Sequence, residues 1–488
     1  MKKLQSQELF INKELPFIIH IDLNSCFAII EQQANRLLRG RPVGVAAYDT
    51  PRGFVLAASY EAKAKGIKLG VNVQQARVMA PGIVIMTPDP VKYRRAHVMF
   101  KEVMLEYTPS VSPKSIDEFV LDMRASPIYR QKVAQLSEIT HEVHERVMRE
   151  IGQEMKARIA ERLGEWVTVN VGVAPNRFLA KYAAGFDKPD GMTVIDYRNL
   201  RERYDNMALV DLPGINTRYR ARLRNHRIYN PLQFLDADIN LLRKQVFKGI
   251  VGYYWYLRLR GHEIDDQEFT RKSIGHQYAL PDKTTDIEKL ERLLMKLCEK
   301  TGRRLRKNNY YASGIHLYLG FDQYRDGYSS DDAYVKREAT NEGGTEEAGG
   351  FNLHKFRSWH HGEKLPYRLY TTSDIYEAAK RLLHQAEIPN RVKIMSVHVY
   401  GLEPWEPIQT SLFDTMADAE LSKGSSTQQN AGSVYRNYEA KKRASDAVDA
   451  INSRYGEFVL TPALMMEMQG TILDRVAFGS VRDMDQSG

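Results

Sequence analysis

Three acidic residues have side chains and positions suited to binding a metal ion. Asp117 and Glu118 are adjacent and precede the apolar run 119–121, which predicts a β-strand leading into the interior. Asp22 ends another apolar run, 17–21, which predicts a central strand. Alone, the adjacent pair would fit a solvated hairpin turn, but a carboxylate that ends a buried strand is rarely left unpaired. If the two strands are neighbours, the three carboxylates converge, and oxygen ligands of this kind bind hard divalent cations.

Length and composition limit the classes of protein to consider. The chain has 488 residues, which is too long for one hydrophobic core and predicts three or four domains. Its formal charge of +9 favours a polyanionic partner. Two cysteines are too few for a disulfide framework and fit a reducing cytosol. The first residues are polar, so we expect no signal peptide, and no apolar run is long enough to cross a membrane.

The elements around the acids alternate between strands and helices. We expect, in order, strand 17–24, a helix carrying Phe27, strands 43–47 and 53–58, helices 59–65 and 89–107, the acidic hairpin, helix 132–163 and strand 166–173. This order predicts a mixed α+β sheet domain with a smaller lobe inserted into it.

Basic residues accompany two turns that could contact phosphate. Lys188 lies in the Pro/Gly turn 185–191 after a short helix, where it could be a phosphate ligand or a solvated lysine at an ordinary helix end. Residues 197–266 read as short basic helices, with a turn at 212–215 followed by several arginines. A glycine turn beside arginines can bind a phosphate without reading base sequence, although some of these arginines could be plain helix surface.

The C-terminal half has a second repeating pattern. Residues 271–402 predict the order βαββαβ, a small sheet backed by two helices. A polar stretch at about 324–352 reads as a flexible insertion, and 415–433 resembles a linker. A last helix is expected over 435–455.

Several of these segments together resemble the Y-family DNA polymerases, in particular translesion enzymes of the polymerase IV type. The resemblance rests, in order, on 21–27, 59–63, 115–118, 176–191, 247–249 with Arg260-Gly261, and 272–275, and it extends from about residue 16 to 408. It implies an α+β multidomain fold: a ferredoxin-like palm with inserted fingers, a helical thumb and a βαββαβ little finger. The implied domains are the palm at 1–33 and 93–196, fingers at 34–92, thumb at 197–268, little finger at 269–408, and a clamp-binding motif with the C-terminal tail at 409–488.

The resemblance also implies roles for individual residues. Asp22, Asp117 and Glu118 match the catalytic carboxylates that hold two Mg²⁺ ions, and Phe27 matches the aromatic gate that excludes a ribose 2′-OH. The implied triphosphate contacts are Tyr60, Lys63 and Lys188, and the implied DNA-backbone contacts are Gly214, Arg218 and Arg222. For Phe27, the alternative is an ordinary core-facing helix residue.

The chain departs from the family pattern at three of these places. Lys63 stands where arginine is usual, so a point charge replaces a bidentate fork. Asn24 stands where many members have another aspartate, and Asn216 stands where a second glycine is common, which weakens the phosphate-binding interpretation of the turn. The acidic trio is intact, which favours a polymerase that copies damaged DNA over the alternative of a non-catalytic DNA-binding scaffold.

A short segment after the last predicted strand could bind a partner protein. Gln409, Leu412 and Phe413 match the Gln-x-x-Leu-Phe peptide by which bacterial members of this family bind the sliding clamp; alternatively, the apolar pair folds back onto its own domain. The resemblance implies primer-template DNA and deoxynucleoside triphosphates as substrates. It also implies a monomer that acts in the bacterial cytoplasm at the nucleoid.

Overall fold

The computed structural model describes residues 10–205, 207–267, 270–322, 358–405, 431–456 and 459–466. Described residues up to 267 form one compact unit, and those from 270 onward form another. Within this described part of the chain, no helix combines the length and the apolar character needed to traverse a bilayer.

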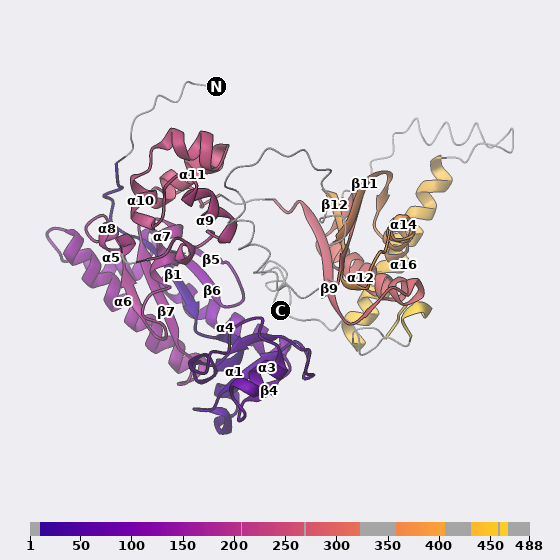
Figure 1. Cartoon of the computed structure of the whole chain (residues 1–488), viewed down its shortest axis with the longest axis horizontal. Helices are drawn as coiled ribbons and strands as arrows, with labels where there is room; N and C mark the ends of the chain where they lie inside the picture. The colour runs from indigo at the N-terminus through magenta and orange to yellow at the C-terminus, as the bar shows by residue number, and fades with distance from the viewer. Residues whose placement is uncertain are drawn as a thin grey trace, which may run out of the picture. The chain divides into compact units, whose positions relative to one another are not determined.

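A five-stranded sheet lies at the centre of the first unit (Figure 1). Its order is β5-β6-β1-β7-β8, with β1 in the middle. The strands are β1 Ile18–Leu23, β5 Val111–Pro113, β6 Glu118–Asp122, β7 Val169–Ala174 and β8 Met192–Val194. Strand β1 pairs antiparallel with both β6 and β7. The expectation that the two acid-bearing strands are neighbours is therefore confirmed.

The two faces of β1 pack against different layers because successive side chains alternate. Ile19, Ile21 and Leu23 join the core formed with α1 (Cys26–Ala34), α4 (Pro90–Tyr107) and α6 (His141–Leu163). Ile18 joins a second core with α7 (Arg177–Ala183) and the helices that follow. His20 and Asp22 share the parity of Ile18, so they lie on the α7 side of the sheet.

The single helix expected over 132–163 is wrong, because the structure has two helices there. Helix α5 spans Pro127–Val133, and α6 begins only at His141. Ser126 and Thr140 cap the two starts by accepting hydrogen bonds from the backbone N–H groups of Tyr129 and Val143. The second cap gives α6 its own start, which a continuous helical pattern conceals.

A small lobe is inserted between α1 and α4. It contains the sheet β3-β2-β4, with β2 at Val43–Ala46, β3 at Val55–Ala58 and β4 at Val84–Met86, and the helices α2 (Tyr60–Ala64) and α3 (Val73–Met79). Its separate core includes Val55, Ala62 and Ile67.

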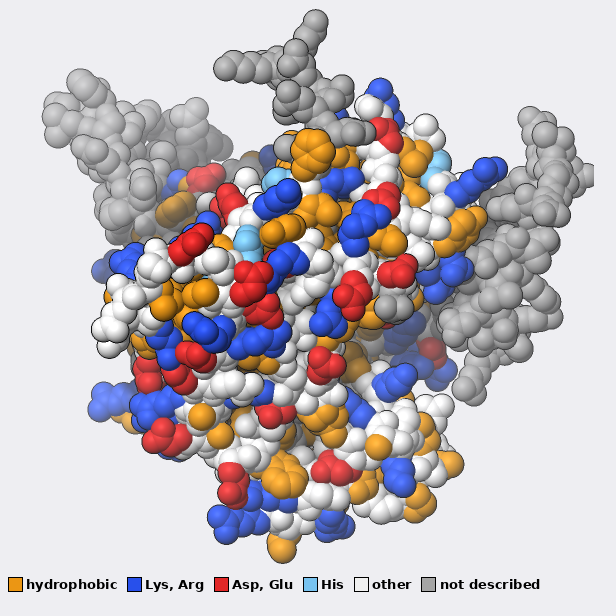
Figure 2. Space-filling view, turned by 90° about the vertical axis from the view of Figure 1, so that its left-hand side faces the viewer, with side chains coloured by type: hydrophobic (Ala, Val, Ile, Leu, Met, Phe, Trp, Pro, Cys, Tyr) orange, Lys and Arg blue, Asp and Glu red, His pale blue; other side chains and the backbone are white. Residues whose placement is uncertain are grey.

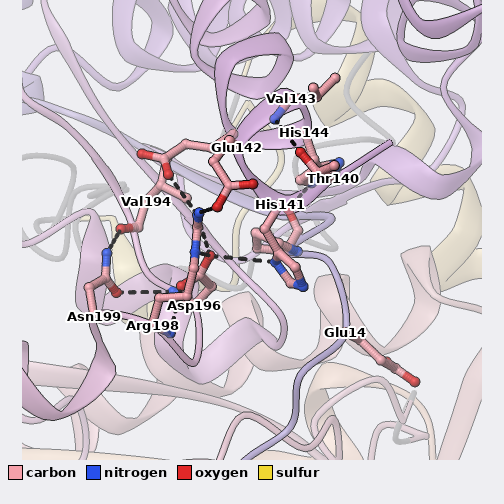
Figure 3. A network of polar contacts seen from close by, with 12 residues as sticks. Glu14, Thr140, His141, Glu142, Val143, His144, Val194, Asp196, Arg198 and Asn199 are labelled. Carbon is pink, nitrogen blue, oxygen red and sulfur yellow. Dashed lines mark hydrogen bonds and ion pairs between the residues drawn. The ribbon is translucent and has the colours of Figure 1, made fainter. Parts of the chain in front are cut away.

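Short helices complete the first unit. They are α8 Leu200–Asp205, η3 Leu209–Asp211, α9 Thr217–Arg224, α10 Pro231–Asp236, η4 Leu241–Val246 and α11 Ile250–Leu259. Figure 3 shows how the chain enters them after β8: Arg198 joins the buried Asp196 to Glu142 at the start of α6. Asn199 donates a hydrogen bond back to the Val194 carbonyl.

The second unit confirms the predicted order βαββαβ. The elements are β9 Ser273–Thr284, α12 Ile287–Lys307, β10 Tyr310–Phe321, β11 Ser358–Leu369, α14 Thr372–Gln385 and β12 Val392–Pro404. They form an antiparallel sheet in the order β11-β10-β12-β9, covered on one face by α12 and α14 (Figure 1). Helix α16 (Ala431–Tyr455) is tied to α12 by the ion pair between Arg306 and Asp449 at 2.6 Å. The insertion predicted at about 324–352 lies outside the described residues.

Candidate active site

The three predicted acids meet at one end of the two central strands. Asp22 in β1 lies directly opposite Glu118 in β6. Asp117 immediately precedes β6, and its carbonyl accepts a hydrogen bond of 2.9 Å from the Leu23 N–H. Strand pairing thus brings Asp22 close to the adjacent pair Asp117 and Glu118, which lie about a hundred residues further along the sequence.

Each acidic side chain has a partner within the protein. Asp22 pairs with Lys188, and Asp117 accepts a hydrogen bond from the Ser115 hydroxyl. Both oxygens of Glu118 bond the Lys181 ammonium, at 2.9 and 2.8 Å. Burial raises the pKa of Asp22, which Lys188 opposes, and burial likewise raises the pKa of Asp117, which the Ser115 hydroxyl opposes.

The donor chemistry of this cluster suits a divalent cation, although the side chains are turned toward lysines. Carboxylate oxygens at the end of a sheet are the ligands that Mg²⁺ prefers. Among the described residues, however, no group of three or more His, Cys, Asp or Glu side chains is arranged to hold a metal as it stands. Lys188 pairs with Asp22, and Lys181 pairs with Glu118. A cation at this site would compete with the two ammonium groups for the carboxylate oxygens.

A basic cluster lies beside Asp22. Lys63 in α2 has its Nζ 4.4 Å from the centre of the Tyr60 ring. Burial, followed by repulsion from Lys188, lowers the pKa of Lys63. Burial and the nearby charge of Asp22 raise the pKa of Tyr60 to about 12, so its hydroxyl stays protonated. The structure thus brings Tyr60, Lys63 and Lys188 together around one carboxylate, where a polyphosphate would find positive charge.

Phe27 lies in the first turn of α1, just after the end of β1. Its side chain is buried, and its ring stacks on the ring of Tyr93 with the centroids 4.5 Å apart and the planes 17° apart. The Phe27 ring therefore follows the acidic end of β1 closely in the chain, and the Tyr93 ring packs against one of its faces.

A cavity of about 460 Å³ opens beside Glu118, on the α7 side of the sheet. Its lining includes Glu118, Lys181, His20, Lys114 and Gly214. His20 is 2% exposed, and burial lowers its pKa to about 4, so it is neutral. A larger hollow of about 650 Å³ is lined by α6 residues alone. On the face shown in Figure 2, acidic and basic side chains are interspersed. They are also interspersed around the larger hollow, which makes that hollow a weaker candidate for binding a polyanion.

Of the predicted DNA-backbone contacts, Gly214 lies in the turn before α9, and Arg218 and Arg222 lie within α9. Gly214 is exposed and has a φ of +92°, a backbone conformation that residues other than glycine rarely adopt. Arg218 and Arg222 are exposed. Asn216 caps α9 and accepts hydrogen bonds of 3.0 Å from the N–H groups of Arg218 and Tyr219. These two amides are thereby occupied and are not available to a phosphate.

Comparison with known proteins places this geometry in a family. A model of the impB/mucB/samB family matches residues 21–185, and the model of that family's C-terminal domain matches residues 271–412. DNA polymerase IV of Moorella thermoacetica is 30% identical over 466 residues, which cover 93% of this chain and 97% of the relative. The chain belongs to the Y-family DNA polymerases, in the polymerase IV group. DNA polymerase IV of Pelotomaculum thermopropionicum is 27% identical over 94% of this chain and 97% of its own length.

A solved structure supports the same fold. A chimera of the Y-family DNA polymerases Dbh and Dpo4 matches 80% of this chain and 99% of its own length, with a TM-score of 0.62 and 22% identity. The predicted α+β multidomain fold is therefore confirmed. As a member of the polymerase IV group, the protein is a DNA-directed DNA polymerase of the translesion type, and the alternative of a non-catalytic scaffold is set aside.

Two residues at the site of this Y-family polymerase were not singled out from the sequence. Lys181 is a lysine within an otherwise largely apolar helix, and His20 is a histidine in the middle of a buried strand. A histidine in the middle of a buried strand is uncommon, and this was the available signal for His20. Lys181 is exposed, so the sequence gives no such signal for it.

Proposed function

We propose that Asp22, Asp117 and Glu118 hold two Mg²⁺ ions and that the enzyme adds deoxynucleotides to a primer 3′ end during the copying of damaged template. Bound divalent cations would lower the pKa of the primer 3′-hydroxyl and neutralise charge on the triphosphate. The observation that carries the proposal is the strand register, which sets Asp22 opposite Glu118 beside Asp117. The domain boundaries given above, the monomeric state and action at the bacterial nucleoid belong to the same proposal.

The two lysines support a division of the site into two sides. Lys188, with Tyr60 and Lys63, would bind the triphosphate beside Asp22, and Phe27 would exclude ribonucleotides. Lys181 and the cavity beside Glu118 would accept the end of the primer strand, with Gly214, Arg218 and Arg222 following its backbone. A lysine released from a carboxylate by a cation becomes available to a phosphate, so substrate and cations would arrive together.

The test is single-nucleotide primer extension with Mg²⁺ by the Asp117→Asn variant. The change keeps the size of the side chain but removes a charged oxygen, so we expect the rate to fall more than about 100-fold while primer-template binding persists. Asp122→Asn, at the opposite end of β6 where the aspartate pairs with Arg124, is the matched control and should extend normally. Near wild-type extension by Asp117→Asn would end the proposal.

We also propose that Gln409, Leu412 and Phe413 bind the sliding clamp; these residues lie outside the described part of the chain. Tethering to a ring on DNA would raise the effective concentration of a loosely held enzyme. Changing Leu412 and Phe413 together to alanine should preserve clamp-free extension and abolish stimulation by the clamp. Stimulation that survives would assign the contact to another segment.

A further inference from the structure

We infer that Glu31 is a positioning residue for sugar selectivity, because it holds Tyr93 against Phe27. The inference rests on the proposed role of Phe27 as the gate. Phe27 and Glu31 are four residues apart in α1, so their side chains project from the same face of that helix. Tyr93 comes from α4 and packs across both of them.

Tyr93 is held at both ends of its side chain. Its ring stacks on Phe27, with centroids 4.5 Å apart, and its hydroxyl donates a hydrogen bond of 2.9 Å to Oε1 of Glu31. Tyr93 is fully buried, and Glu31 is only 2% exposed. A tyrosine fixed in this way cannot slide along the Phe27 ring without leaving a buried hydroxyl unpaired, which is costly.

The second oxygen of Glu31 explains how a carboxylate is tolerated in this core. Oε2 pairs with the Lys92 ammonium at 2.6 Å, and Lys92 is the residue before Tyr93 in α4. Asp89 caps the same end of α4 by accepting a hydrogen bond of 3.1 Å from the Lys92 N–H. One buried carboxylate therefore binds two consecutive residues of α4, which fixes the first turn of that helix against α1.

The consequence follows from how a steric gate works. Exclusion of one hydroxyl group depends on a ring that does not retreat, and Tyr93 is the group packed against the Phe27 ring in a near-parallel stack. Without the Glu31 acceptor, Tyr93 can shift and Phe27 gains room to move away from the sugar. Ribonucleotides should then bind better, while the carboxylates and lysines that act on the triphosphate are untouched.

The experiment compares kcat/KM for a deoxynucleotide and for its ribonucleotide in the full-length enzyme. Glu31→Met, which removes the acceptor, and Tyr93→Phe, which removes the hydroxyl, should each reduce the ratio about tenfold, mainly through a lower KM for the ribonucleotide. The double variant should lose no more than either single one, because both changes break the same bond. Glu31→Gln keeps an acceptor oxygen and should retain most of the selectivity.

Two controls separate positioning from general damage. Tyr129→Phe removes another buried tyrosine hydroxyl, which lies 2.7 Å from Nδ1 of His144, and should leave the ratio unchanged. Phe27→Ala should lower the ratio at least as much as Glu31→Met. If Phe27→Ala lowers it while Glu31→Met and Tyr93→Phe do not, the inference fails and the proposed gate stands. If all three variants keep wild-type selectivity, the inference and the gate both fail.

Discussion

Lys181 and Lys188 each balance one acidic side chain at the end of the central strands. Lys181 bonds Glu118, and Lys188 pairs with Asp22. The two contacts approach the acids from different segments, one from α7 and the other from the turn after it. Because the two lysines come from different segments, changing each one separately tests which side of the site binds DNA and which binds the nucleotide.

We predict crossed effects for the two lysines. Lys181→Met should weaken primer-template binding about tenfold and change the KM for the nucleotide little, because one charge-assisted phosphate contact is lost. Lys188→Met should do the opposite. Equilibrium binding of primer-template and steady-state nucleotide titrations measure the two effects. If Lys181→Met instead raises the nucleotide KM, the two sides of the site have been assigned in reverse.

His144 gives the stability of the first unit a pH dependence. It is fully buried, with Nδ1 2.7 Å from the Tyr129 hydroxyl and Nε2 3.0 Å from the Pro16 carbonyl, and burial lowers its pKa. The unfolded histidine binds a proton near pH 6.5, whereas the folded one does so only at lower pH. The stabilising contribution is therefore present above pH 6.5 and is lost as the pH falls below it.

The matching measurement is the difference in unfolding temperature between the wild type and His144→Gln. We expect this difference to shrink between pH 7.5 and pH 5.5, because glutamine does not titrate. His384→Gln removes an exposed histidine paired with Glu291 and serves as a control that should not reproduce the effect. A difference that stays constant across this range would show that His144 is not kept neutral.

At the scale of helices and strands, the sequence predicted most of what is local. Alternation and apolar runs located β1 and β6, and the order βαββαβ followed from the same signals. The contact of Lys181 with Glu118 joins residues 63 positions apart, and the stack of Phe27 on Tyr93 depends on how α4 packs on α1. Such contacts are set by tertiary packing, which the periodicity of one segment does not report. The break before α6 was missed because a cap can interrupt a pattern that remains helical on both sides.

We expect the ion-pair network in Figure 3 to stabilise the packing of α6 against the segment that connects β8 to α8. Arg198 contacts Asp196 at 2.7 Å, Glu142 at 2.6 Å and Glu145 at 2.8 Å, and the Asp196 side chain is 1% exposed. Arg198→Ala would leave a buried carboxylate without its main partner, and we expect a loss of about 3 kcal/mol in the free energy of unfolding.

Denaturant unfolding of Arg198→Ala checks this prediction against a matched arginine. Arg149→Ala removes an exposed arginine that pairs with Glu145 at 2.8 Å and donates a hydrogen bond of 3.4 Å to the Met192 carbonyl, and it should cost about 0.5 kcal/mol. Equal losses in the two variants would mean that Asp196 is satisfied by its remaining neighbours, of which His141 lies 3.6 Å away.

At the scale of the whole molecule, the excess of positive charge is the property that most affects DNA binding. The formal charge is +9, yet many basic side chains of the first unit are already paired, such as Arg158 with Glu106 and Arg201 with Asp236. Paired arginines on a mixed-charge surface release few counterions from DNA. The arginines that follow the Gly214 turn are better placed, because Arg218 and Arg222 are exposed and adjacent to the proposed primer path.

We therefore predict that Arg218 and Arg222 contribute a measurable share of the salt dependence of DNA binding. Each phosphate neutralised adds about 0.9 to the slope of log K against log salt. The double change to alanine should reduce that slope by about 1.8 and weaken binding to a similar extent for unrelated template sequences. Arg149→Ala with Arg201→Ala removes the same charge from residues already paired with Glu145 and Asp236, and should leave the slope close to that of the wild type. If the two double variants reduce the slope equally, net charge, rather than Arg218 and Arg222 in particular, determines how the enzyme binds the DNA backbone.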